Sequence, residues 1–335
     1  MKNEDLDYFK KWFEGYCGSY IIENVGAAAA ENVGAAAAEN VGADGAGAGA
    51  AASEAAEDRK NYSMKREHTV RVMENAALIA QKHPPGAGVR NPTDAGVGSP
   101  TDEGVGNPID AGVGNPAAEN YVLIARAAGL FHDVGRFPQY AKYKTFRDAV
   151  SVNHGVLGAE TLVENAVMTR LPRDEQDVIL HAVKYHNAFR IPAAQHRPDP
   201  VFLKIVRDAD KLDIWRVFTE MFDMPSADWP SAATLDLPDT DSYTPDVLEC
   251  VLGKRPVAHA KVRCVNDFKL IQLSWIFDLN FKTSFELLGQ RNYMTLLAAR
   301  LPRTDGVLKL QEMLQNFIAE KLYRGKPEIA ENLKS

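Results

Sequence analysis

Apolar residues recur at intervals of three and four along most of the chain, as they do on one face of an α-helix. The clearest example is residues 64–82, where Val70, Met73, Ala77 and Ala80 follow this spacing. Few segments alternate apolar and polar residues in the two-residue period of a strand. The pattern therefore predicts an all-α fold, with helices within these segments: 3–22, 64–82, 121–130, 151–167, 173–187, 201–222, 267–301 and 305–323.

Two segments depart from this pattern, because they are tandem repeats with a period of eight residues. Residues 23–46 repeat ENVGAAAA before decaying into Ala and Gly, and residues 88–119 repeat units such as GVGNPIDA. A repeat solenoid is one interpretation, but solenoid repeats usually have a period of about 20 residues or more. Large apolar side chains are too few to offset the entropy of ordering these segments. We expect 23–58 and 84–119 to be disordered inserts in loops of a single helical domain, residues 1–335.

Two local signals predict helix beginnings in the middle of the chain. Ser151 is expected to cap the helix that contains NHGVLGAETLVENAV, because a serine hydroxyl can accept a hydrogen bond from the first turn. Pro172 is expected just inside the next helix, where its missing N–H costs nothing. Pro and Gly recur in the second repeat, which excludes a regular helix there.

Composition narrows the function classes. The 335 residues are 45% hydrophobic and carry a formal net charge of −7, which argues against a general nucleic-acid binder. The start MKNEDLDYFKKWFEGY lacks the apolar core of a signal peptide, and no apolar run reaches the roughly 18 residues of a membrane span. The three cysteines lack CxxC spacing, so neither a disulfide framework nor a zinc knuckle is expected. A cytoplasmic protein without a membrane partner is predicted.

Three predicted helices each bring a histidine or a carboxylate into apolar-periodic sequence. His68 lies in the second, His132 and Asp133 end the third, and Asp210 lies in the helix RDADKLDIW. A carboxylate in a packed helix is costly to bury unless it is paired or bound to a metal. Such a mixed nitrogen and oxygen set suits Mn, Fe, Co, Ni, Zn or, less well, Mg. Asp213 is expected to anchor helix packing rather than to bind metal.

The order of these residues resembles the H…HD…D signature of the HD-domain superfamily of metal-dependent phosphohydrolases. LFHDVGRFPQY is similar to the end of the family's HD helix, and RDADKLDI is similar to its final-aspartate motif. The resemblance covers about residues 65–215 once the second insert is removed. It implies an HD-domain helical bundle, with an additional C-terminal helical region, in which His68, His132, Asp133 and Asp210 hold a divalent metal ion.

His154 and His186 resemble the extra ligands of HD proteins that bind two metal ions. Asp133 could then bridge two ions, as carboxylates do in paired-metal hydrolases. The alternative is that these histidines make ordinary hydrogen bonds, and His181 could compete for the role of His186.

Nearby cations are candidates for binding a substrate phosphate. Lys65 lies three residues before His68, Arg136 follows the HD pair, and Lys211 follows the last aspartate. With Asp133 they form the predicted catalytic set, although each cation could instead form a salt bridge to Asp148 or Asp208. Further candidate substrate contacts lie on the segment that leaves the HD pair: Gln139, Tyr143, Thr145 and Asp148.

The predicted activity is hydrolysis of a phosphate ester, a nucleotide or a small phosphomonoester, by metal-activated water. Two alternatives remain open from the sequence. One is a di-iron oxygenase, because some HD-fold proteins are di-iron oxygenases and need the same six ligands. The other is a regulatory module that binds a nucleotide without turning it over. The class that cleaves cyclic dinucleotides is disfavoured, because YHNAFRIP contains no GYP tripeptide. The oligomeric state is not predicted.

Overall fold

The computed structural model describes residues 1–35, 45–83, 115–191, 198–235, 237–255, 257 and 259–323. These residues contain helices and no strand, which confirms the predicted all-α class. The α-helices are α1 (Asn3–Ala35), α2 (Gly45–Lys82), α3 (Pro116–Phe131), α4 (Arg136–Tyr143), α5 (His154–Glu164), α6 (Arg173–Tyr185), α7 (Val201–Met221), α8 (Pro245–Leu252), α9 (Val265–Ser274), α10 (Lys282–Arg291), α11 (Tyr293–Ala298) and α12 (Asp305–Tyr323). Short 3-10 helices connect them: η1 (Asp148–Val150), η2 (Ser226–Asp228), η3 (His259–Lys261) and η4 (Trp275–Asp278).

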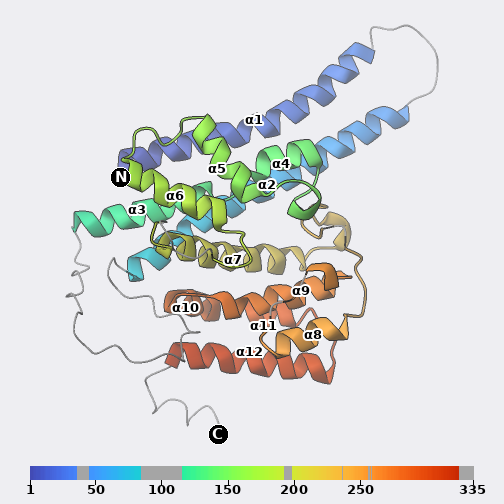
Figure 1. The fold of residues 1–335 in the computed structure, drawn as a ribbon. Helices are drawn as coiled ribbons and strands as arrows, with labels where there is room; N and C mark the ends of the chain where they lie inside the picture. Colours follow the sequence, from blue (N-terminus) through green and yellow to red (C-terminus); the bar gives the residue numbers. More distant parts are fainter. Residues whose placement is uncertain are drawn as a thin grey trace.

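Helix α7 lies between two groups of helices (Figure 1). On one side it packs against α2, α3 and α6, and on the other against α10 and α11. Most of its apolar residues are buried, with Trp215 at 0% exposure, so it forms the shared centre of the core. Polar side chains on such a helix must find partners inside the protein, which applies directly to Asp210.

Helices α2 and α3 approach each other closely at Gly129. A Cβ atom on Gly129 would lie 3.0 Å from the Cα of Met73 and 3.1 Å from the carbonyl oxygen of Val72. Only glycine fits between the two backbones at this distance without a shift. The close packing holds the end of α3, with His132 and Asp133, against the His68 face of α2.

The helix that begins with His154 is capped by a residue other than the predicted one. Asn153 is the cap, and its side chain accepts a hydrogen bond from the backbone N–H of Val156 at 3.0 Å. Ser151 lies two residues too early, and its hydroxyl donates to the carbonyl of Arg147 instead. Pro172 is the residue just before α6 rather than the first inside it.

The first repeat segment is partly helical, where the sequence analysis predicts a loop. Helix α1 continues to Ala35 and α2 begins at Gly45, while residues 36–44 lie outside the described part of the chain. This repeat is rich in alanine, the best helix former, and contains no proline. In the second insert, residues 84–114 also lie outside the described part. Asn115 already caps α3, so residues 115–119 belong to that helix region.

The C-terminal helices are joined to α7 through Asp208. This carboxylate is 0% exposed and accepts hydrogen bonds from the backbone N–H groups of Asn280 and Phe281 and from the Ser284 hydroxyl. It therefore satisfies the N–H groups of the two residues that directly precede α10. Within the described residues, no helix is long and apolar enough to cross a membrane.

Candidate metal centre

Five helices converge on one point through six side chains. His68 lies within α2 and Asp210 within α7, whereas His132 and Asp133 follow the last turn of α3. His154 is the first residue of α5, and His186 directly follows α6. All four histidines and Asp133 are buried. The structure thus brings together all six residues that the sequence analysis names as candidate ligands: His68, His132, Asp133, His154, His186 and Asp210.

Hydrogen bonds orient the four imidazole rings in the same sense. The Nδ1 atom of His132 donates to the carbonyl of Gly129, and that of His186 donates to the carbonyl of Val183, both at 2.8 Å. The Nδ1 atoms of His68 and His154 pair with carboxylates, which can only accept. These partners place the ring proton on Nδ1 in each case. Every Nε2 atom therefore points to the centre of the cluster, where it carries a lone pair whenever its ring is neutral.

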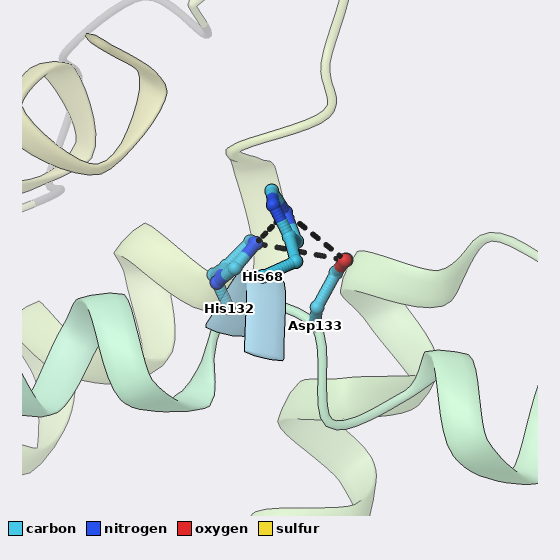
Figure 2. A group of neighbouring side chains, drawn as sticks. All are labelled: His68, His132 and Asp133. Carbon is cyan, nitrogen blue, oxygen red and sulfur yellow. Dashed lines mark hydrogen bonds and ion pairs between the residues drawn. The ribbon is translucent and has the colours of Figure 1, made fainter. Parts of the chain in front are cut away.

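One group of donors, which we call the first site, consists of His68, His132, Asp210 and Oδ2 of Asp133. Nε2 of His68 lies 3.3 Å from Nε2 of His132, 3.1 Å from Oδ1 of Asp210 and 3.6 Å from Oδ2 of Asp133. Nε2 of His132 lies 3.6 Å from each of the same two carboxylate oxygens. Figure 2 shows His68, His132 and Asp133 pointing toward one another.

A second group, the second site, consists of His154, His186 and Oδ1 of Asp133. The two Nε2 atoms lie 2.9 Å apart, and they lie 3.4 and 3.7 Å from that oxygen. The two oxygens of Asp133 thus face different pairs of histidines. A carboxylate in this position can bridge two cations.

The donor atoms fit divalent metal ions. An ion with bonds of about 2.1 Å separates neighbouring ligand atoms by roughly 3.0–3.4 Å, depending on whether it is octahedral or tetrahedral. The separations within the first site, 3.1 to 3.6 Å, are close to this range. Two neutral imidazoles whose Nε2 lone pairs face each other also gain nothing from each other unless a cation lies between them. The residues present can therefore hold one ion in each site.

The charges of the cluster are strongly coupled. Burial alone would lower the pKa of His68, but its hydrogen bonds to Asp210 and Asp213 raise it to about 9. Burial dominates at His154, where with the Arg136 charge it lowers the pKa to about 3. Burial opposes ionisation of Asp133, yet Lys65 and His132 hold the pKa of its carboxyl well below the usual range. The cluster attracts positive charge, which a metal ion would supply.

Two cations also contact the carboxylate of Asp133. Lys65 donates to Oδ2 at 2.9 Å, and Nε of Arg136 lies 3.5 Å from Oδ1. Both cations lie over the ring of Phe146, at 5.2 and 5.8 Å from its centroid. The buried Nε–H of Arg136 has no hydrogen-bond partner among the described residues. Two positive groups and one free donor therefore border the metal centre.

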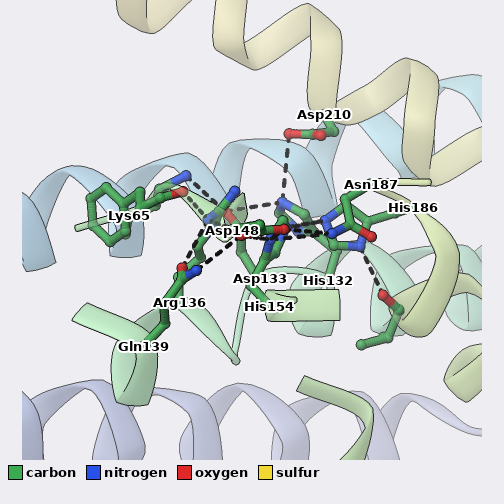
Figure 3. A network of polar contacts seen from close by, with 12 residues as sticks. Lys65, His132, Asp133, Arg136, Gln139, Asp148, His154, His186, Asn187 and Asp210 are labelled. Atoms are coloured by element: carbon green, nitrogen blue, oxygen red, sulfur yellow. Dashed lines mark hydrogen bonds and ion pairs between the residues drawn. The ribbon is translucent and has the colours of Figure 1, made fainter. Parts of the chain in front are cut away.

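Asp148 connects the second site to its surroundings (Figure 3). Its carboxylate accepts hydrogen bonds from Nδ1 of His154 at 2.7 Å, and from Arg136, Gln139 and Asn187 at 2.9 Å each. Burial would raise the pKa of Asp148, but its contacts with His154 and Arg136 lower it far below the usual value. Arg136 thus makes the Asp148 salt bridge that the sequence left open as its alternative role, and it borders Asp133 as well.

Lys211 is placed differently from the other candidate cations. Its Nζ lies 2.9 Å from Oδ2 of Asp278, which also binds Arg207 at 2.6 Å. Lys211 thus pairs with a carboxylate of η4, and no contact with the six candidate ligands is seen in the described part of the chain. Of the other candidate contacts, Tyr143 is exposed, and Thr145 accepts a hydrogen bond from the backbone N–H of Arg147.

Glycine at position 135 lets α5 reach the metal centre. A Cβ on Gly135 would collide with the carbonyl oxygen of His154 and would lie 2.6 Å from the nitrogen of Gly158. The glycines of HDVG and HGVLG are the sequence signal for this contact, although no role was predicted for them. Phe146 and Asn187 were not predicted as site residues either.

The part of the chain that bears this site matches a family model. Residues 66–215 match the model described as the HD domain. A search of curated proteins and a search of solved structures each gave no match.

Proposed function

Because residues 66–215 make this chain a member of the HD-domain superfamily, we propose that it is a metal-dependent phosphohydrolase. It would cleave a phosphate ester of a nucleotide or another small molecule. One observation carries the proposal: the two oxygens of Asp133 face separate pairs of histidines, while Lys65 and Arg136 border the same carboxylate. The site thus combines metal ligands with groups that can bind phosphate.

His68, His132, Asp133 and Asp210 would hold one divalent ion, and His154 and His186 with Asp133 would hold another. A bound divalent ion supplies two things to ester hydrolysis: a lower pKa for water and polarisation of a phosphoryl oxygen. The Nδ1 hydrogen bonds keep all four imidazoles in the tautomer that can ligate. This orientation is preformed, so the chain spends little free energy on arranging its ligands.

Lys65 and Arg136 would bind the phosphate and stabilise the charge that develops on its oxygens. In the structure both groups offset the negative charge of Asp133. Once divalent ions bind to Asp133 and offset this charge, Lys65 and Arg136 become available to a phosphate. The unpartnered Nε–H of Arg136 offers a hydrogen bond to an incoming oxygen. The Phe146 ring, under both cations, keeps them at the edge of the site.

Asp210 marks the most accessible edge of the first site. Its side chain is 18% exposed, whereas those of His68, His132 and Asp133 are at most 4% exposed. A substrate would therefore approach past Asp210 and meet a largely dry site, where charges interact more strongly than in water.

The experiment is a phosphate-release screen over nucleotides and small phosphomonoesters, with Mn, Fe, Co, Ni, Zn or Mg added to the purified full chain. Asp133→Ala is the test variant. It removes a ligand of both sites, so we expect turnover to fall by about 10³-fold or more, which corresponds to roughly 4 kcal/mol of transition-state stabilisation. Asp177→Asn, an exposed position on α6, is the matched control and should retain activity.

Full phosphatase activity of Asp133→Ala after metal removal would contradict the proposal. So would two bound irons that consume oxygen without releasing phosphate, because that result identifies a di-iron oxygenase. Nucleotide binding without product from any ester would instead favour the regulatory module. Circular dichroism of each variant must show the helical content of the parent protein.

A further inference from the structure

Two carboxylates outside the ligand set each contact one histidine of the metal centre. Oδ2 of Asp213 accepts from Nδ1 of His68 at 2.8 Å, and Asp148 accepts from Nδ1 of His154 at 2.7 Å. The other two histidines donate to backbone carbonyls. Each site therefore has one imidazole with a carboxylate partner. Such a partner orients the ring and makes it a stronger ligand.

Asp213, the carboxylate that contacts His68 of the first site, is buried and has few competing hydrogen-bond donors. The Asp213 side chain is only 2% exposed, and its hydrogen bonds within the described part of the chain are to His68 and Arg216. Arg216 donates mainly to Oδ1 at 2.7 Å and reaches Oδ2 at 3.2 Å. Oδ2 thus remains largely directed at the imidazole, and little solvent screens it.

Asp148, the carboxylate that contacts His154 of the second site, is partly exposed to solvent and accepts hydrogen bonds from several donors. The Asp148 side chain is 30% exposed, and three other donors compete with His154 for its oxygens: Arg136, Gln139 and Asn187. Arg136 is the counterpart of Arg216 at Asp213, so the difference lies in the two amide donors and in the greater exposure of Asp148. Asp148 therefore strengthens His154 as a ligand less than Asp213 strengthens His68.

The metal ligands themselves also carry more negative charge in the first site than in the second. The first site has Asp210 in addition to its share of Asp133, whereas Asp133 is the only carboxylate among the ligands of the second. One cation borders each site, Lys65 at Oδ2 and Arg136 at Oδ1 of Asp133, so these charges roughly offset each other in the comparison. The first site is more negative by about one carboxylate, and it attracts a divalent ion more strongly.

We infer that the centre takes up its two divalent ions in order, the first tightly at His68, His132 and Asp210 and the second weakly at His154 and His186. Asp213 and Asp148 act as positioning residues, each of which sets the affinity of its own site. The weak site makes the loaded state depend on the free metal concentration. This inference rests on the metal centre of the proposed function but not on its reaction.

The test is a calorimetric titration of the metal-free full chain with Mn²⁺. The parent protein should bind two ions in two classes, with dissociation constants at least about tenfold apart. Asp213→Asn should weaken the tight class by about 10–100-fold and change the weak class by less than about threefold. Asp148→Asn should weaken mainly the weak class, by a smaller factor than Asp213→Asn weakens the tight one. Asp177→Asn should change neither class. His186→Ala should remove the weak class and retain the tight one.

Two binding sites of equal affinity, or only one bound ion per chain, would overturn the inference. Equal weakening of both classes by either asparagine variant would overturn it too, as would loss of the tight class in His186→Ala. If Asp213→Asn does not fold, Asp148→Asn decides alone, because Asp148 is partly exposed and asparagine can still accept from His154. Two classes of Mn²⁺-binding sites without phosphate release from any ester would support the inference and contradict the proposed function.

Discussion

The two sites of the metal centre differ in whether they have ligands from within helices, in addition to His132 and Asp133 at the end of α3. The first takes His68 and Asp210 from within α2 and α7, two long helices that pack against each other along several turns. The second takes both its histidines from helix ends, at the beginning of α5 and just after α6. A ligand within a packed helix is fixed by the core on both sides. A ligand at a helix end depends on the local turn, so the second site should be the more sensitive to single substitutions.

Among the substitutions that test this comparison, Gly135→Ala has the largest expected effect. The added methyl group would collide with the first turn of α5 and displace His154 from Asp133. We expect one Mn²⁺ per chain instead of two, phosphate release lowered by about 100-fold and unfolding free energy lowered by about 1–3 kcal/mol. Metal stoichiometry, turnover and urea unfolding measure these three effects.

Gly15→Ala is the matched control for this substitution. A Cβ at this position in α1 meets nothing within 4 Å, so alanine should stabilise the protein by roughly 0.5–1 kcal/mol. Two Mn²⁺ ions bound to Gly135→Ala with parental affinity would show that the helix end is not the weak point.

Lys65→Gln sharpens the comparison from the side of the first site. Lys65 contacts Oδ2 of Asp133, the oxygen that faces His68 and His132. Loss of one charged hydrogen bond to phosphate should lower kcat/KM by about 10–100-fold, while affinity of the second site for Mn²⁺ stays unchanged. Lys60→Gln, which removes an exposed lysine of the same helix, should leave kcat/KM as it is. Equal kinetics of the two variants would exclude Lys65 from phosphate binding.

The smallest expected effect concerns Asp278, which reaches the second site through Arg207. Arg207 donates to the carbonyl of His186 at 2.8 Å and to Asp278 at 2.6 Å. Burial opposes ionisation of Asp278, but Lys211 and Arg207 lower the pKa of its carboxyl. A depressed pKa contributes stability above the ordinary value of about 4, and this stability is lost as pH falls through the depressed pKa.

Asp278→Asn should therefore be less stable than the parent at pH 7, and the difference should shrink as the pH is lowered below about 4. The difference should be small, because solvent screens this half-exposed group. Urea unfolding of both proteins at several pH values measures it. A difference that stays constant across this range would show that the Asp278 charge contributes nothing.

The sequence predicted the helical class and the family because both depend on signals that are local along the chain. Helical periodicity and the sequence motifs around His132, Asp133 and Asp210 each lie within single segments. The all-α class and the HD domain are both confirmed. The convergence of six side chains followed from the family resemblance rather than from spacing. Whether they bind metal ions stays a prediction.

Partners from distant segments were beyond sequence reasoning. Lys211 pairs with Asp278, 67 positions further along the chain, and nothing in the residues around Lys211 indicates it. Asp148 was expected to contact substrate, yet its position beside His154 depends on how η1 turns back toward α5. Asp213 was expected to anchor helix packing, and its bond to His68 requires the exact facing of α2 and α7.

The eight-residue repeat at the end of α1 and the beginning of α2 affects how the length of this chain can change during evolution. Residues 23–35 of the repeat form the end of α1 and residues 45–46 begin α2, and these two helix ends project away from the other helices (Figure 1). His68 lies some 20 residues further along α2. Gain or loss of one eight-codon unit by replication slippage would alter a helix by about 12 Å. The pairing of residues 62–80 with α3 and α7 would stay in register. Descendant chains can therefore differ in length at this projection and inherit the same cluster of histidines and aspartates.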